Sequence, residues 1–540
     1  MDRLPPDEKD LLQTLAVIGR EFSFGLLRNV VAKSDEELNR MLTDLQLGEF
    51  VYEQPATDDI EFIFKHALTR DVAANSMLIE KRKALHERTA QAIEVLYAER
   101  LDDHVGNLAH HYAQSANTWQ AVKYLYLAGQ QAVQRSAHQQ AIAHLTAGLE
   151  LLDTLPESPE REARELELAS ALVQVLQHTK GYSAPETVEV AARARALAEK
   201  TGNLAQLVLQ LSSICRAAFV SGNYRKAGVL ADQLLGVAQR QGSPTSLWLA
   251  HYSQLQARCL SGDPIGAEEN FGSMCSLFEM AGFQQVPGMN VAAMGNASLP
   301  VWILGRAERS RECILRANVF AQASKNPYDL AYARFWESWL YRRLREPQRA
   351  DAAATQAVAL SEEHGFLLLR EMALICMGWA RAYLGDTDEG VSLIRKGLAG
   401  RAENEARVGI TDYITVLAEA LALDGALTDA LSTIEDALQA NPQEMIFRPN
   451  ILTCRGELQF KIGRAELAEA DFREAIALAQ KMSAKAWELG ATTSLARLLA
   501  KQDRRDQART MLADIYGWFT EGFDTAGLKD ARALLDELAA

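Results

Sequence analysis

The amino-acid sequence predicts an all-α protein, and its composition, its length and an internal period lead to that prediction. Ala, Leu, Glu and Arg dominate a chain of 540 residues that holds only 14 prolines, and these four residues lose little free energy on entering a helix. A single hydrophobic core stops growing beyond roughly 250–300 residues. A pattern typical of two helices and a turn recurs over most of the second half of the chain. Stacked helical repeats are therefore expected.

The repeated unit is a pair of helices joined by a tight turn. Each turn begins with Gly or a polar residue and reaches a small residue five positions later, and successive small residues are 38 to 43 positions apart. Glycine at the first position supplies the left-handed cap that ends a helix. Apolar residues four and eight positions after the small residue give the second helix one packing face. The eight turns are Gly222–Ala227, Gly262–Ala267, Gly305–Ser310, Arg345–Ala350, Gly385–Gly390, Gly425–Ala430, Gly463–Ala468 and Asp503–Ala508.

A tetratricopeptide-like α-α superhelix, or solenoid, fits this unit best, and HEAT-like packing is the structural alternative. In such a solenoid each pair contacts mainly the pairs before and after it. The first helix of each pair is expected to line the concave face.

Four segments are expected along the chain. Residues 1–80 do not repeat, and they predict a winged-helix-like module with helices at 7–18, 23–32 and 35–47. Two strands follow, at 50–53 and 60–64, with a turn at 55–59 between them. We expect irregular helical repeats over 81–203, regular repeats over 204–525 and a capping helix over 526–540.

The charge of the chain disfavours nucleic acid as a partner. The net charge is −15, and residues 1–80 carry 16 Asp and Glu against 8 Lys and Arg, a net of −8. A helix that reads DNA needs basic or amide side chains, whereas the third predicted helix begins Asp35-Glu36-Glu37. No run of about 18 apolar residues predicts a membrane span, and no signal peptide is recognised. A cytoplasmic location without membrane contact is therefore expected.

Three stretches of the sequence resemble a known family. Residues 484–538, and within them the string Tyr516–Phe523, are similar to the C-terminal end of large bacterial signalling ATPases of the STAND/AAA-like type that carry tetratricopeptide repeats. Residues 4–27 and 62–94 resemble the winged-helix segment of those proteins and the helix after it. In that family the ATPase module lies upstream, often behind a class III adenylyl/guanylyl cyclase domain.

The resemblance implies an interaction and sensor module of a bacterial signal-transduction ATPase or adenylate cyclase-type protein. Its solenoid groove would bind a protein, a peptide or a small ligand. The chain departs from the family pattern at Ala74, where an aromatic residue is usual, and at Gly490, where Arg is usual. The alternatives are a stand-alone tetratricopeptide scaffold and a transcription regulator whose winged helix contacts DNA.

No catalytic centre is recognised in the sequence. It holds no Gly-x-x-x-x-Gly-Lys-Ser/Thr loop to cradle phosphates. No Ser-His-Asp, Cys-His or paired-carboxylate arrangement stands out from the background. The chain is expected to be non-catalytic and to need no cofactor, with any ATPase or cyclase activity in upstream domains absent from it. The sequence leaves open whether it is a fragment of a larger protein or a stand-alone relative.

The candidate binding residues lie on one aromatic helix near residues 328–343. Tyr332, Trp336 and Trp339 are followed there by Arg342 and Arg343. Aromatic rings and arginine are enriched at protein interfaces, and the arginines could meet an anionic group. The alternative is that these rings pack between neighbouring repeats.

Histidines supply two further hypotheses. A histidine of the winged helix contacts the nucleotide phosphates in related signalling ATPases, so the resemblance implies a nucleotide-sensing role for His66 in a larger chain. The alternative for His66 is a buried residue that caps a helix. His104, His110 and His111 are close in sequence, but no two of them are four residues apart. Because no Cys-x-x-Cys pair occurs either, no metal site is expected.

Overall fold

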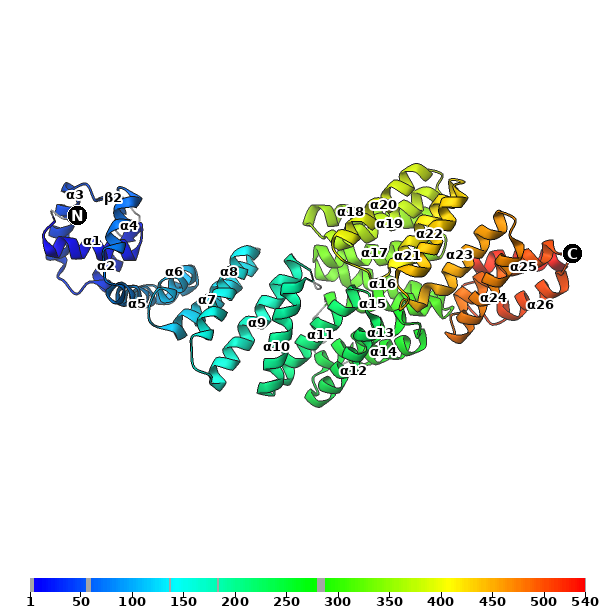
Figure 1. The fold of residues 1–540 in the computed structure, drawn as a ribbon, viewed down its shortest axis with the longest axis horizontal. Coiled ribbons are helices and arrows are strands. Elements are labelled where there is room, and N and C mark those ends of the chain that lie inside the picture. The colour runs from blue at the N-terminus through cyan, green and yellow to red at the C-terminus, as the bar shows by residue number, and fades with distance from the viewer. Residues whose placement is uncertain (1–3, 55–59, 136, 182–183, 279–286, 540) are drawn as a thin grey trace. The chain divides into compact units, whose positions relative to one another are not determined.

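The computed structural model describes residues 4–54, 60–135, 137–181, 184–278 and 287–539, which are helical except for one small sheet (Figure 1). The chain forms two compact units. The first comprises residues 1–180 and 189–202, and the second comprises residues 181–188 and 203–540. The finer division predicted at residues 80 and 525 stays a prediction. Among the described helices, none has the length and apolar character needed to cross a membrane.

The N-terminal part of the first unit contains the predicted helices and strands. Strand β3 lies between β1 and β2 and pairs antiparallel with both. β1 was not predicted, because a strand of three residues is too short to show an alternating pattern. The predicted turn at 55–59 lies outside the described residues, and the winged-helix-like assignment stays a prediction. The elements are α1 (Pro6–Ile18), β1 (Glu21–Ser23), α2 (Phe24–Val30), α3 (Asp35–Leu47), β2 (Val51–Gln54), β3 (Glu61–Phe64) and α4 (Ala67–Asn75).

The remainder of the first unit is a row of helices that pack in chain order. These are α5 (Ile79–Leu96), the short 3-10 helix η1 (Ala98–Arg100), α6 (Leu101–Ala113), α7 (Thr118–Gln134), α8 (His138–Asp153), α9 (Pro159–Thr179) and α10 (Pro185–Thr201).

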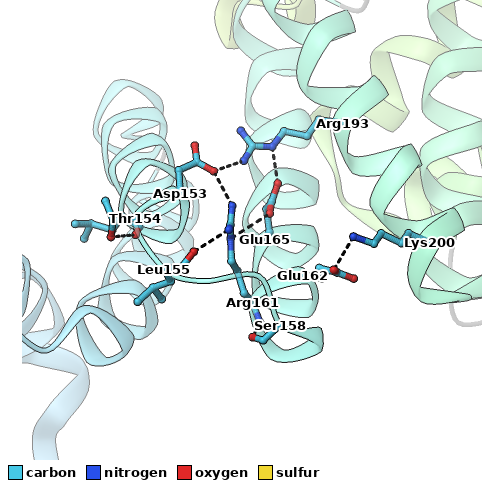
Figure 2. Close-up of polar contacts among 10 residues, drawn as sticks. Asp153, Thr154, Leu155, Ser158, Arg161, Glu162, Glu165, Arg193 and Lys200 are labelled. Carbon is cyan, nitrogen blue, oxygen red and sulfur yellow. Dashed lines mark hydrogen bonds and ion pairs between the residues drawn. The ribbon is translucent and has the colours of Figure 1, made fainter.

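Ion pairs tie the last three of these helices together (Figure 2). The guanidinium of Arg193 on α10 donates to Glu165 on α9 at 2.6 Å and to Asp153 on α8 at 2.9 Å. Arg161 also reaches Asp153, at 3.3 Å. The break that separates α8 from α9 ends at Ser158, whose hydroxyl caps α9. A network in which one carboxylate serves two arginines fixes the order of three helices better than isolated surface pairs would.

The second unit consists of eight helical pairs and a final helix among its described residues. The first helices are α11 (Leu204–Val220), α13 (Pro244–Leu260), α15 (Pro287–Ile303), α17 (Pro327–Arg343), α19 (Leu367–Tyr383), α21 (Ile410–Leu423), α23 (Arg448–Lys461) and α25 (Lys485–Lys501). The second helices are α12 (Tyr224–Gln241), α14 (Pro264–Phe278), α16 (Ala307–Ser324), α18 (Pro347–His364), α20 (Thr387–Glu403), α22 (Leu427–Ala440), α24 (Ala465–Lys481) and α26 (Arg505–Tyr516). A 3-10 helix η3 (Met445–Phe447) precedes α23, and α27 (Ala526–Ala539) is the last helix.

The predicted caps are confirmed at all eight turns. The first residue of each turn has a positive φ, from +57° at Arg345 to +105° at Gly385. Six of the eight are glycines, which adopt this conformation without steric cost. Arg345 and Asp503 adopt it with a side chain, so the surrounding turn imposes the left-handed conformation even where glycine is absent.

Helices α19 and α20 approach each other closely at a pair of glycines. A Cβ atom added at Gly378 would lie 2.5 Å from the carbonyl oxygen of Gly390, and one added at Gly390 would lie 2.6 Å from that of Gly378. Both contacts are with backbone, which cannot move aside as a side chain can. This crossing therefore requires two glycines.

We predict that Gly378→Ala lowers the free energy of unfolding by about 1–3 kcal/mol, because overpacking strains a close helix crossing. The matched control is Gly490→Ala in α25, where nothing lies within 4 Å of an added Cβ atom. The free energy of unfolding of that variant should rise by up to about 1 kcal/mol, because alanine has a higher helix propensity than glycine. Urea unfolding followed by circular dichroism measures both, and equal effects of the two substitutions would contradict the assigned crossing.

Candidate functional site

The second unit contains a cavity of about 170 Å³ whose wall is built mainly from first helices. α11, α13, α15, α17, α19 and α21 all contribute, which agrees with the expectation that first helices line the inner face. The wall includes Arg216, Phe219, Tyr252, Gln256, Asn296, Tyr328, Tyr332, Trp336, Trp339, Met372, Asp412 and Tyr413.

A chain of amide and hydroxyl groups crosses this wall from α13 through α15 to α17. The side-chain amide of Asn296 donates to the hydroxyl of Tyr252 at 3.0 Å and to that of Tyr332 at 2.9 Å. The amide of Gln256 donates to Tyr252 at 3.0 Å and to the Asn296 oxygen at 3.2 Å. Because each group fixes the next, the wall presents ordered polar atoms between aromatic rings.

Aromatic rings of α17 form the apolar part of the wall. Tyr328 stacks on Tyr332 with ring centroids 5.8 Å apart, and it meets Phe366 edge-on at 5.2 Å. Tyr328 is exposed and Tyr332 half-buried, whereas Trp336 and Trp339 are buried. The stripe therefore combines buried rings with rings that are partly exposed, and binding by these residues stays a prediction.

Trp336 carries an unpaired polar atom. Its indole packs against Gly295 so closely that a Cβ atom there would overlap the ring. The indole nitrogen is buried and has no hydrogen-bond partner among the described residues. A buried donor without a partner costs free energy, so the close packing of this ring against Gly295 has an energetic cost.

Arg342 and Arg343 are held by a buried carboxylate. Both donate to Asp412 of α21, and the side chains of all three are at most 5% exposed. Burial alone would raise the pKa of Asp412, but the two guanidinium charges outweigh it and hold that pKa below its ordinary value. Burial and the charge of Arg342 together lower the pKa of Arg343.

Four aromatic rings surround the Arg343 guanidinium. They belong to Trp302, Trp339, Phe447 and Trp487, with centroids between 4.9 and 5.9 Å from its central carbon. The cation–π contacts and the bond to Asp412 keep this charge inside the protein.

The five predicted binding residues are divided between two cavities. Tyr332, Trp336 and Trp339 line the first cavity together with Asp412. Arg342 and Arg343 line a second one of about 260 Å³. The expectation that the two arginines offer their charge beside the aromatic stripe is therefore corrected. Asp412 lies between them and the first cavity and neutralises part of their charge.

A second buried carboxylate closes the turn of the superhelix around the first cavity. Glu444 accepts hydrogen bonds from the Tyr224 hydroxyl, from the Gly409 backbone at 2.6 Å and from the Thr411 backbone at 2.9 Å. The Val220 carbonyl oxygen accepts from the backbone of Val408 at 3.0 Å. The first pair of the unit thereby contacts the loop before α21, about 190 residues further along the chain.

The predicted histidines lie in the first unit. His66 is the N-cap residue of α4, but its side chain makes no capping bond and is exposed, so the alternative of a buried capping residue is corrected. His104 stacks on Tyr97 with ring centroids 3.8 Å apart. His110 and His111 instead meet His86 of α5, a residue that the sequence reasoning did not consider.

Sequence reasoning singled out Tyr332 and Trp336 but missed the other polar residues of the wall, although the repeat period relates them to one another. Arg216, Gln256, Asn296 and Trp336 follow one another at intervals of 40 residues, and Tyr252, Tyr332, Met372 and Asp412 stand at multiples of 40 from one another. The two series are four residues apart, which is about one helical turn. They form neighbouring columns on the inner face, and aligning the repeats would have revealed them.

Residues 338–526 match the family model described as the MalT-like TPR region, where TPR denotes the tetratricopeptide repeat. The match assigns these repeats to the tetratricopeptide class rather than to the HEAT-like alternative. It also supports the resemblance to the repeat region of signalling ATPases. A comparison with curated protein sequences finds no match.

Solved structures with related architecture include three repeat proteins. A Rap protein in complex with competence and sporulation factor is 11% identical, with a TM-score of 0.47, over 71% of this chain and 100% of that one. A chain of the APC/C hetero-tetramer Cut9–Hcn1 is 11% identical, with a TM-score of 0.42, over 85% of this chain and 94% of that one. NprR with its peptide NprX is 13% identical, with a TM-score of 0.39, over 54% and 82%. None is similar enough to carry an argument about this chain.

We predict that Asp412→Asn lowers the free energy of unfolding by about 3–5 kcal/mol, because it leaves two buried arginines without a carboxylate. The control is Asp530→Asn. Asp530 pairs with Arg345 at 2.7 Å, but both side chains are about 40% exposed, so its loss should cost about 0–1 kcal/mol.

The pH dependence gives the same prediction a second test. Because the pKa of Asp412 is lowered in the folded protein, its stabilisation is complete above the unfolded pKa of about 3.9 and is lost as the pH falls through the lower folded value. Chemical unfolding at pH 7 and pH 5 should therefore give the same difference between wild type and variant. If wild type and Asp412→Asn had the same free energy of unfolding at pH 5, that result would contradict the assigned ion pair.

Proposed function

We propose that the second unit is a sensor that binds a short, extended peptide segment of a protein partner in its inner cavity. The observation that carries the proposal is the polar and aromatic wall formed by Gln256, Tyr252, Asn296 and Tyr332 across three successive first helices. A wall formed by three successive first helices runs along the superhelix rather than around a single point. A peptide in an extended conformation can follow the same direction.

The chemistry of the wall fits a peptide. The hydroxyl and amide groups of the wall can exchange hydrogen bonds with peptide N–H and C=O groups. Between these groups, the rings of Tyr328 and Trp339 supply large apolar area with little loss of rotamer entropy. We infer a segment with aromatic or aliphatic side chains at intervals along its length.

The electrostatics favour a ligand of low charge. Asp412 lines the cavity, but its carboxylate is already bonded to Arg342 and Arg343. Arg216, the other charged residue in this wall, has its guanidinium over the Tyr252 ring, with the central carbon 5.8 Å from the ring centroid. Several charged side chains of one ligand could not all find a counter-charge here, and burying an unpaired charge is costly. A strongly acidic or strongly basic peptide is therefore a poorer candidate than an apolar one, and a small neutral ligand is the second candidate for the same wall.

In a larger signalling ATPase, the ligand state of the repeats would be passed to the nucleotide-binding core. His66 is the residue proposed to sense the nucleotide there, and its exposed ring at the start of α4 makes it accessible to a neighbouring domain. The first turn of α3 is acidic, with Asp35, Glu36 and Glu37, which disfavours the alternative of DNA binding by this module.

The test is a random-peptide display library panned on the full chain. We expect enriched peptides rich in aromatic and aliphatic residues. Tyr332→Phe, which removes only the hydroxyl bonded to Asn296, should weaken their binding by about 3–10-fold, the equivalent of one hydrogen bond. Fluorescence anisotropy of a labelled enriched peptide measures the affinity.

Tyr516→Phe in α26 is the matched control, because Tyr516 is absent from the wall of the cavity. It should bind like wild type, and both variants should keep the wild-type melting temperature. Peptides that bind Tyr332→Phe and wild type equally would show that the cavity is not the site.

A further inference from the structure

Helices α5 and α6 are neighbours in the first unit (Figure 1), and three histidines come together where they pack. His86 belongs to α5, and His110 and His111 belong to α6. One ring nitrogen of each lies within 4.8 Å of the others. The Nδ1 atoms of His86 and His111 are 3.0 Å apart.

Two helices are needed to build this group. Adjacent residues on a helix point about 100° apart, so the spacing of His110 and His111 along α6 does not by itself predict that their rings come together. His86 reaches them from the neighbouring helix, with its ring centroid 5.9 Å from that of His110 and 5.3 Å from that of His111. The group is therefore a product of tertiary packing rather than of local spacing.

The chemical state of the rings suits a cation. Burial is the main cause that lowers the pKa of His86 to about 4 and that of His111 to about 3, so both rings are neutral near pH 7. In neutral rings, two facing Nδ1 atoms form a hydrogen bond only when one of them carries the proton. A metal ion accepts both lone pairs at once.

A hydrogen bond from outside the group orients the ring of His111, as is usual for a histidine that binds a metal ion. His111 makes a hydrogen bond with the backbone of Ile18 at the end of α1, and such an outer contact orients a ligating imidazole. His86 and His111 are buried, whereas His110 is exposed. The ring of His110 can therefore change rotamer to close the remaining distance without disturbing the core. The charge of Arg82 also contributes to lowering the pKa of His86, and its guanidinium donates to the side-chain oxygen of Asn75 at 3.2 Å.

We propose that His86, His110 and His111 form a site for a divalent transition metal ion of the zinc type. Three imidazoles are a ligand set that Zn²⁺, Co²⁺, Ni²⁺ and Cu²⁺ all accept, at about 2.0–2.1 Å for zinc. The ion would fasten α5 to α6, next to the end of α1, so that metal binding stabilises the first unit.

The test uses the full chain, freed of metal by a chelator, and titrated with Co²⁺ and then Zn²⁺. We expect one equivalent of Co²⁺ to give the visible absorption of four-coordinate cobalt with nitrogen ligands. Zn²⁺ should displace it and raise the melting temperature. His110→Gln should weaken Co²⁺ binding by at least about tenfold, because even outer-shell losses cost 10–100-fold. This variant should fold, since His110 is exposed.

His104→Gln is the matched control on the same helix, because His104 stacks on Tyr97 away from the group. It should bind Co²⁺ like wild type. Failure of wild type to bind Co²⁺ or Zn²⁺, or equal affinity of wild type and His110→Gln, would overturn the proposal. An absorption typical of cobalt–thiolate bonds would also overturn it, because it would assign the ion to cysteines instead.

Discussion

The ion pair of Asp412 with Arg342 and Arg343 is the constraint on which the second unit depends. In a solenoid each helical pair contacts mainly its neighbours, yet this carboxylate joins α21 to α17, two pairs away. Buried charges must be paired closely, so the distance between these helices has little freedom. The Glu444 contacts add a second fixed distance, between the first pair and the loop before α21. Together they curve the repeats around one cavity.

The same ion pair also determines how much charge faces the first cavity. Asp412 faces the aromatic wall while its arginines face the second cavity, so the first cavity is polar without being strongly charged. Tyr252, Asn296 and Tyr332 supply hydrogen-bonding groups at repeat intervals along three helices. The structural ion pair and the proposed recognition surface thus involve the same helix, α17. The aromatic stripe serves core and groove together for this reason.

The features that the sequence predicted are those with local causes. The left-handed caps from Gly222 to Asp503 follow from the turn residues themselves, and the helices follow from residue spacing along one face. The partner of Arg342 was not predictable in this way, because Asp412 lies 70 residues away. His86 was missed for the same reason, since it meets His111 only through the packing of α5 on α6. The forty-residue period could have supplied the inner columns, but not these pairings.

The central claim is that a ligand enters the inner face formed by the first helices. Hydrogen–deuterium exchange of the full chain, with and without a peptide selected on it, tests this claim most directly. The account predicts slower exchange on peptide binding in α13, α15 and α17, whose side chains form the wall, and unchanged exchange in α12, α14 and α16. Slower exchange confined to these second helices, or to residues 4–180, would contradict it.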